Sequence, residues 1–168
     1  MFGKTLNRPD YRKAEREAAK LLDDFYIAAP PVNPIVMAEQ LGIHVKFVTF
    51  TGNSSGISGY YDCKDDSIYV NADEYPLRQT FTIAHELGHR VLHKDWAESE
   101  AYKVLWRDEG RQGRDFREQE ANAFAASLLM PKYLLDKYVD RISPPSLSTL
   151  FAVSLPAMKV RLSHLYGI

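Results

Sequence analysis

The sequence predicts an α+β fold in which helices precede and follow a small antiparallel or mixed sheet. Apolar residues recur at helical spacing over residues 76–93 and 115–130, whereas residues 43–48, 57–62 and 67–71 show the alternation typical of strands. The chain has 168 residues, of which 45% are hydrophobic, so it is long enough to bury a core of its own. These observations favour one globular unit with a small appendage.

The first helix is expected over residues 10–26, where one face carries apolar side chains at helical spacing and the other carries charges. The proline-rich stretch 30–34 ends it. Asn33 followed by Pro34 is typical of an N-cap with proline at the first helical position, and it predicts a short helix that Gly42 ends.

Three strands are expected next. Residues 43–48 alternate apolar and polar side chains, and residues 51–56 have a loop composition. Residues 57–62 and 67–71 flank a short polar turn that contains Cys63, so we expect them to pair as a hairpin with an exposed thiol at its turn.

The second half of the sequence is predicted to be helical. Pro76 begins a helix that runs to about residue 93, and another spans 115–130. Between them, residues 94–115 are charged, contain two glycines and predict a loop or lid with room for one helical turn. A short helix is expected after Pro131.

The end of the chain predicts two further helices across residues 146–166, with a turn at Val153 and Ser154 as an N-cap. We therefore expect a main domain over residues 1–142 and a short helical tail, similar to a helix-turn-helix, over 143–168.

Composition excludes several classes of protein. The 21 basic and 22 acidic residues give a formal net charge of −1, which argues against binding driven by nucleic-acid or membrane charge. The single cysteine, Cys63, excludes an intramolecular disulfide and a cysteine-based zinc cluster and favours a cytoplasmic setting. We expect no membrane span and no secretory signal, because the sequence lacks the necessary apolar stretches.

Residues 85–89, HELGH, match the HExxH pattern inside the helix predicted over 76–93. Residues four apart lie about 40° apart around a helix and about 6 Å apart along it, so His85 and His89 can share one tetrahedral Zn²⁺. Glu86 is placed to reach a metal-bound water as a general base without being a ligand. A chance match is expected in only about 1% of such chains.

A catalytic zinc needs a third protein ligand. His93 extends the series but lies about 12 Å along the helix axis from His85, too far to share the ion, so we expect it to support the site or to pack. On a helical wheel, Glu118 and Asn122 fall within the apolar stripe of the 115–130 helix, and Glu120 falls on the opposite, solvated face.

A buried carboxylate is costly unless it is paired or metal-bound, which favours Glu118 as the third ligand. The alternative is a surface carboxylate stabilised by the helix dipole. Asn122, one turn further on, is expected to hold a ligand in place through a hydrogen bond.

HELGHRVLH at residues 85–93, followed by EQEANAFAASLLMP at 118–131, resembles the ImmA/IrrE family of metallopeptidases. The preceding strand and hairpin share the resemblance, which covers most of the chain. It implies a gluzincin-like zinc peptidase domain in which His85, His89 and Glu118 bind zinc and Glu86 is the catalytic base. It also implies a protein substrate, a helix-turn-helix repressor of a mobile element, a stress response or a toxin–antitoxin system.

Two alternatives differ in class. The tail at 146–166 predicts DNA binding by its shape, but it offers only Lys159 and Arg161, with His164, where a DNA-reading element brings several cations. Packing or substrate contact is the favoured role for this segment. The other alternative is a metal-sensing regulator whose zinc site does not turn over substrate.

Overall fold

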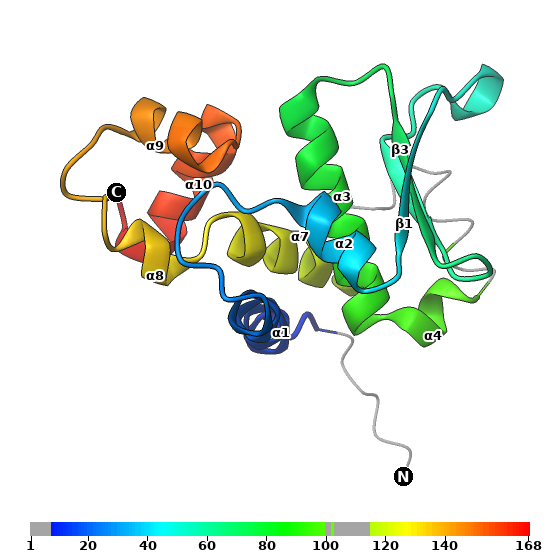
Figure 1. Cartoon of the computed structure of the whole chain (residues 1–168), viewed down its shortest axis with the longest axis horizontal. Helices are drawn as coiled ribbons and strands as arrows, with labels where there is room; N and C mark the ends of the chain where they lie inside the picture. The colour runs from blue at the N-terminus through cyan, green and yellow to red at the C-terminus, as the bar shows by residue number, and fades with distance from the viewer. Residues whose placement is uncertain (1–7, 100–101, 103–114) are drawn as a thin grey trace, which may run out of the picture.

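The computed structural model describes residues 8–99, 102 and 115–168. The lid expected over 94–115 therefore lies mostly outside the described residues. The elements, labelled in Figure 1, are the helices α1 (Tyr11–Asp24), α2 (Pro34–Gln40), α3 (Pro76–Leu92), α4 (Lys94–Ala97), α7 (Phe116–Leu129), α8 (Lys132–Leu135), α9 (Pro144–Phe151) and α10 (Leu155–Tyr166), the 3-10 turn η1 (Gly52–Ser54), and the strands β1 (His44–Val48), β2 (Gly59–Asp62) and β3 (Ser67–Asn71).

The helix starts follow the capping signals of the sequence. The Asn33 side chain accepts from the backbone N–H groups of Ile35 and Val36 at the start of α2, and the Ser154 hydroxyl accepts from Ala157 N–H at the start of α10. Gly42 follows α2 with φ +81°, a left-handed conformation that suits glycine. The predicted α+β class and these helix boundaries are confirmed.

The three strands form one sheet in the order β1-β3-β2. β2 and β3 pair antiparallel, which confirms the predicted hairpin, and β1 pairs parallel with β3. Cys63 follows β2 and is half-buried, with its thiol 3.8 Å from the carbonyl oxygen of Ala97. The expectation of an exposed thiol was wrong, because α4 packs beside the hairpin turn.

Helix α7 packs between α1 on one side and α3 on the other, and the sheet lies beyond α3 (Figure 1). α9 and α10 lie on the far side of α3 from the sheet. Their apolar residues Leu147, Phe151, Met158 and Leu162 join the same buried cluster as the residues of α1, α3 and α7. The C-terminal helices thus share the main core, and the division at residue 143 remains a prediction. Within the described ranges, no helix combines the length and apolarity needed to cross a bilayer.

Candidate metal centre

Three side chains that the sequence analysis singled out meet between α3 and α7. His85 Nε2 lies 3.0 Å from Glu118 Oε2, and His89 Nε2 lies 2.8 Å from Glu118 Oε1. The two imidazole Nε2 atoms are 3.2 Å apart. Two nitrogens and a carboxylate therefore converge on one point.

This donor set fits a divalent metal of the zinc type. Ligands about 2.0–2.1 Å from a tetrahedral ion are about 3.3 Å from one another, and the observed separations of 2.8 to 3.2 Å lie just inside that value. Imidazole nitrogen with one carboxylate oxygen is also a donor set that zinc accepts. Three protein donors would leave the fourth position of a tetrahedral ion open, and the His85 side chain is 13% exposed.

The close approach of α3 and α7 brings the carboxylate to the histidines. Gly88, inside the HELGH segment, lies against Phe124 of α7, and a Cβ at that position would be 3.0 Å from the Phe124 Cδ1 atom. Glu118 lies in the first turn of α7, whose N-cap, Asp115, accepts a hydrogen bond from Arg117 N–H. The helix dipole favours a carboxylate at this end.

Each histidine is held through its second ring nitrogen. His85 Nδ1 is 2.8 Å from Asn122 Oδ1, which requires that Nδ1 carry the proton and donate. His89 Nδ1 is 3.0 Å from His93 Nδ1, and His93 Nε2 is 2.6 Å from Glu120 Oε2. Asn122 is exposed at the edge of the helix interface, although the wheel placed it within the apolar stripe. It is nevertheless positioned to orient His85.

Glu120 departs from its predicted place. The helical wheel put it on a solvated face, but its side chain is only 10% exposed and contacts His93. The prediction was wrong because it assumed one buried face, whereas α7 is covered by α3 and by α1 on different sides. The backbone N–H of Asp10, at the start of α1, donates to Glu120 Oε1 at 2.6 Å.

Glu86 lies beside the three convergent side chains and is 6% exposed. The Tyr102 hydroxyl donates to Glu86 Oε2 at 2.9 Å and accepts from Tyr61 N–H at 2.7 Å. The Tyr102 ring packs against Trp96 and His89. One oxygen of Glu86 is thus held by Tyr102, and the residue lines the cleft described below.

Without a metal, the charges in this site favour a proton on the His85 imidazole over a proton on the Glu118 carboxylate. Burial lowers the pKa of His85, but the hydrogen bond to Glu118 and the charges of Glu86 and Glu118 outweigh it and raise this pKa to about 9. Burial raises the pKa of Glu118, yet its contacts with His85 and His89 hold it well below its usual range. Burial lowers the pKa of His93 to about 4, so this ring is neutral near pH 7. Burial also raises the pKa of Tyr102, which keeps its hydroxyl a donor.

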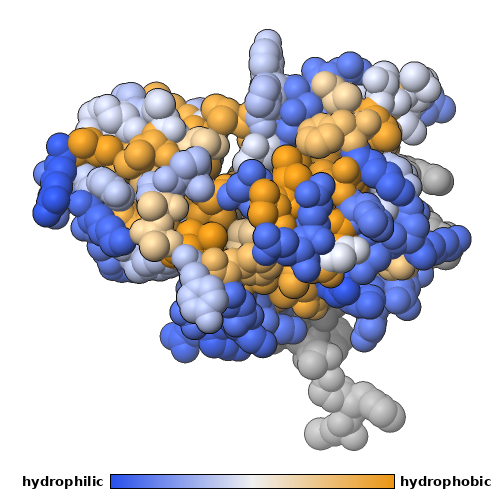
Figure 2. Space-filling view, viewed as in Figure 1, coloured by the Kyte–Doolittle hydropathy of each residue, from blue (hydrophilic) through white to orange (hydrophobic). Residues whose placement is uncertain are grey.

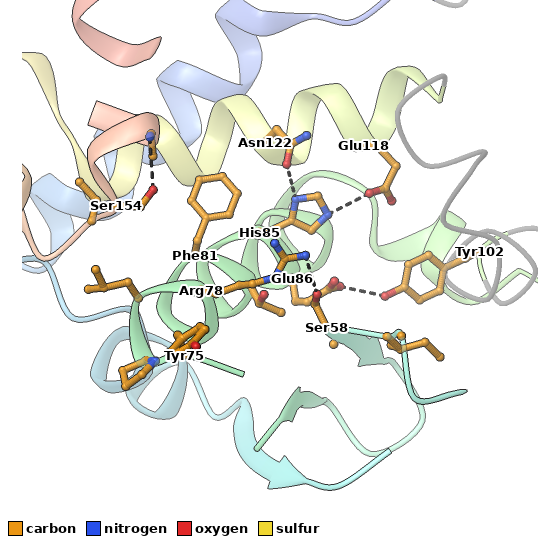
Figure 3. Close-up of a pocket in the computed structure, with 18 residues that line it drawn as sticks. Ser58, Tyr75, Arg78, Phe81, His85, Glu86, Tyr102, Glu118, Asn122 and Ser154 are labelled. Atoms are coloured by element: carbon orange, nitrogen blue, oxygen red, sulfur yellow. Dashed lines mark hydrogen bonds and ion pairs between the residues drawn. The ribbon is translucent and has the colours of Figure 1, made fainter. Parts of the chain in front are cut away.

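A cleft of about 1080 Å³ opens onto the centre. One end is lined by His85, Glu86, Tyr102, Glu118 and Asn122, which point toward its interior (Figure 3). One side is the stretch of chain entering β2, and the other end reaches the turn between α9 and α10. In the space-filling view, apolar surface borders the notch between the C-terminal helices and the part of the molecule that carries α3 (Figure 2).

Two residues of the centre escaped the sequence analysis. Tyr102 lies in a stretch without periodicity, and no local pattern marks one tyrosine of ten as a partner of Glu86. For Glu120 the sequence did hold a hint. Glu118 and Glu120 lie on different faces of a helix that is otherwise mostly apolar, which could have indicated that α7 is buried on two faces and that Glu120 needs a buried partner such as His93.

Two histidines one helical turn apart, a glutamate from a second helix and a further glutamate beside them form a centre of the metallopeptidase type. Comparison with known families agrees: residues 38–163 match the IrrE N-terminal-like domain. The chain belongs to this family of peptidases, whose members hold a metal.

Several known proteins resemble the chain. The radiation response metalloprotease IrrE of Deinococcus radiodurans is 30% identical over 139 residues, which cover 81% of this chain but 40% of the relative. The metallopeptidase ImmA of Bacillus subtilis is 27% identical, over 68% of this chain and 66% of its own length. Immunity region protein 2 of Bacillus phage phi105 is 26% identical, over 79% and 77%. The chain therefore spans less than half of the IrrE protein.

The fold also has a solved counterpart. A Mycobacterium tuberculosis transcriptional regulator superposes with a TM-score of 0.66 over 90% of this chain and 46% of the regulator, at 18% sequence identity. At that identity the comparison supports the fold alone.

Proposed function

We propose that this chain is a zinc-dependent endopeptidase of the gluzincin type, with His85, His89 and Glu118 as metal ligands and Glu86 as general base. The observation that carries the proposal is the convergence of the three ligand atoms beside Glu86 on a cleft large enough for a peptide. The third ligand is a glutamate from a separate helix, which is the gluzincin arrangement. When bound, the zinc would lower the pKa of a coordinated water and polarise the scissile carbonyl.

Glu86 is the residue that moves protons. Its carboxylate takes a proton from the attacking water and returns it to the amine that leaves. Tyr102 holds one of its oxygens, so the carboxylate keeps one orientation through both transfers. His93 and Asn122 act on the ligands rather than on the substrate, because each contacts a histidine Nδ1 atom.

The edge of β2 offers a place for an extended substrate. Asn71 N–H donates to the Ser58 carbonyl, so the backbone of Ser58 faces β3. Tyr61 N–H instead points away from β3, toward Tyr102. Gly59 shares the orientation of Tyr61, since alternate residues of a strand face the same way. Its N–H and C=O therefore point toward the cleft, where a substrate strand can pair with them.

We infer that the substrate is a protein regulator of the repressor class in the cytoplasm. One relative is named a radiation response metalloprotease, which ties a peptidase of this family to a regulated response, and another is named an uncharacterized immunity region protein. Direct DNA binding through residues 146–166 is disfavoured, because Arg161 is only 7% exposed and its Nε–H donates to the Met130 carbonyl at 3.1 Å. Few cations of the C-terminal helices are left to contact phosphates.

The decisive variant is Glu86→Gln, which keeps the size of the side chain and removes the base. The zinc-loaded wild type should cleave a helix-turn-helix regulator encoded beside its gene, and a bacterial peptide library read by mass spectrometry should report the cleavage preference. The variant should bind one zinc and cleave neither substrate. Equal cleavage by the variant would exclude Glu86 as the base, and zinc binding without cleavage by the wild type would favour the metal-sensing regulator.

A further inference from the structure

The carboxylate of Glu120 is buried beside the metal centre but does not point at it. One oxygen is 2.6 Å from His93 Nε2, and the other accepts the backbone N–H of Asp10 at 2.6 Å. Both oxygens therefore have a partner, one in the residue that caps the end of α3 and one in the residue that precedes α1. A charge at this depth needs such partners to be stable.

In the series of hydrogen bonds from Asp10 N–H through Glu120 and His93 to His89, the chemistry of each group decides which atom donates. A backbone N–H only donates and a carboxylate only accepts, so His93 Nε2 must carry a proton to make its 2.6 Å contact. If His89 binds a metal through Nε2, its proton must lie on Nδ1, which points at His93 Nδ1, so His93 Nδ1 must be unprotonated and accept. The 3.0 Å contact with His89 is satisfied when His89 Nδ1 carries the proton.

This assignment leaves a lone pair on His89 Nε2, the atom that faces Glu118 and His85. The opposite tautomer of His93 would direct its Nδ1–H against the Nδ1–H of His89. His89 could relieve that clash only by carrying its proton on Nε2, which excludes metal ligation through that atom. The Glu120 carboxylate, at the far end of this series of hydrogen bonds, thus fixes the protonation pattern in which His89 Nε2 can bind a metal.

We propose that Glu120 is a positioning residue of the metal centre: acting through His93, it holds His89 in the tautomer and orientation that bind the metal. The inference rests on the proposed metal centre. Asp10 N–H completes the carboxylate's partners, so the docking of α1 on α7 supports the same geometry. His85 has a simpler arrangement, in which the Asn122 amide oxygen alone accepts from Nδ1.

The test is the zinc affinity of Glu120→Gln, measured by competition with a chromogenic chelator. Glutamine has one accepting oxygen, so it can accept from Asp10 N–H or from His93 Nε2–H but not from both. Loss of such an indirect partner costs about 10- to 100-fold in metal affinity, and we expect a loss in that range. Glu39→Gln, an exposed carboxylate at the end of α2, is the matched control and should bind as the wild type does.

The route through His93 is tested by a double-mutant cycle. His93→Phe should weaken zinc binding, and adding Glu120→Gln should weaken it no further. An affinity of Glu120→Gln within twofold of the wild type would overturn the proposal, as would losses that simply add. The wild-type protein gives a test that needs no variant: nitrogen-15 shifts of the imidazole rings should report protons on His89 Nδ1 and His93 Nε2. A proton on His93 Nδ1 in the zinc-loaded protein would overturn it.

Glu118→Ala separates this inference from the proposed function. If Glu118→Ala loses zinc and Glu120→Gln does not, the metal centre stands and the positioning role fails. If Glu118→Ala binds zinc as tightly as the wild type, the proposed centre itself is wrong.

Discussion

Gly88→Ala tests whether the contact between α3 and α7 sets the metal geometry. A methyl group at Gly88 would lie 3.0 Å from Phe124 Cδ1 and 3.3 Å from its Cβ and Cγ. Carbon atoms pack at about 3.5–4.0 Å, so the helices must part locally by about 0.5 Å. The atoms Cβ and Cγ form the base of the side chain, which leaves a rotamer change little scope to relieve the contact. Metal sites tolerate errors of only about 0.2 Å in ligand distance, and Glu118 lies on the displaced helix.

The size of the effect follows from overpacking, which costs about 1–3 kcal/mol in a well-packed core. If zinc binding requires the original spacing, the zinc-bound state carries this strain, and zinc affinity falls about 5- to 150-fold. Stability of the metal-free protein should change less, because alanine is favoured over glycine in a helix by about 1 kcal/mol. Chelator competition and thermal unfolding measure the two quantities. Thr80→Ala, whose hydroxyl donates to Pro76 within α3, is the control for helix propensity. An unchanged zinc affinity in Gly88→Ala would refute the reasoning.

Three further predictions concern other parts of the centre. His85, with its pKa raised to about 9, is protonated at pH 7.5 in the metal-free protein, so zinc must displace that proton. Calorimetry in two buffers should show about one proton released per zinc, with affinity rising up to about pH 9; release of none would contradict the assignment. Gly59→Ala would place a methyl 2.5 Å from the Tyr69 carbonyl oxygen and 2.6 Å from Thr82 Cγ2, so it should lower the free energy of unfolding by about 1–3 kcal/mol or more, and an unchanged melting temperature would be inconsistent with that packing. Tyr102→Phe should lower kcat about tenfold, or about 1.4 kcal/mol in the barrier, with zinc affinity unchanged. An unchanged kcat would show that Glu86 does not need this hydrogen bond.

Local signals in the sequence predicted most of the elements because the interactions that create them are local. Asn33 and Ser154 cap the helices they precede, and Pro76 begins α3. The parallel pairing of β1 with β3 was not predicted, since it joins segments separated by η1 and β2 and leaves no trace in the alternation of either strand.

The convergence of His85, His89 and Glu118 could be predicted for a related reason. Spacing within one helix places the two histidines together, and a carboxylate in an apolar stripe needs a partner. The surroundings of these three residues depend on which helices cover α7, which a single helical wheel does not contain. Glu120 was therefore assigned to solvent, although it faces His93 and the start of α1.

The most direct test of the metal centre is zinc K-edge X-ray absorption of the zinc-loaded protein. Ligation by His85, His89 and Glu118 predicts two imidazole rings and only nitrogen or oxygen neighbours, at about 2.0–2.1 Å. Three imidazole rings, which would bring His93 into the coordination shell, or a sulfur at about 2.3 Å from Cys63, would contradict the account.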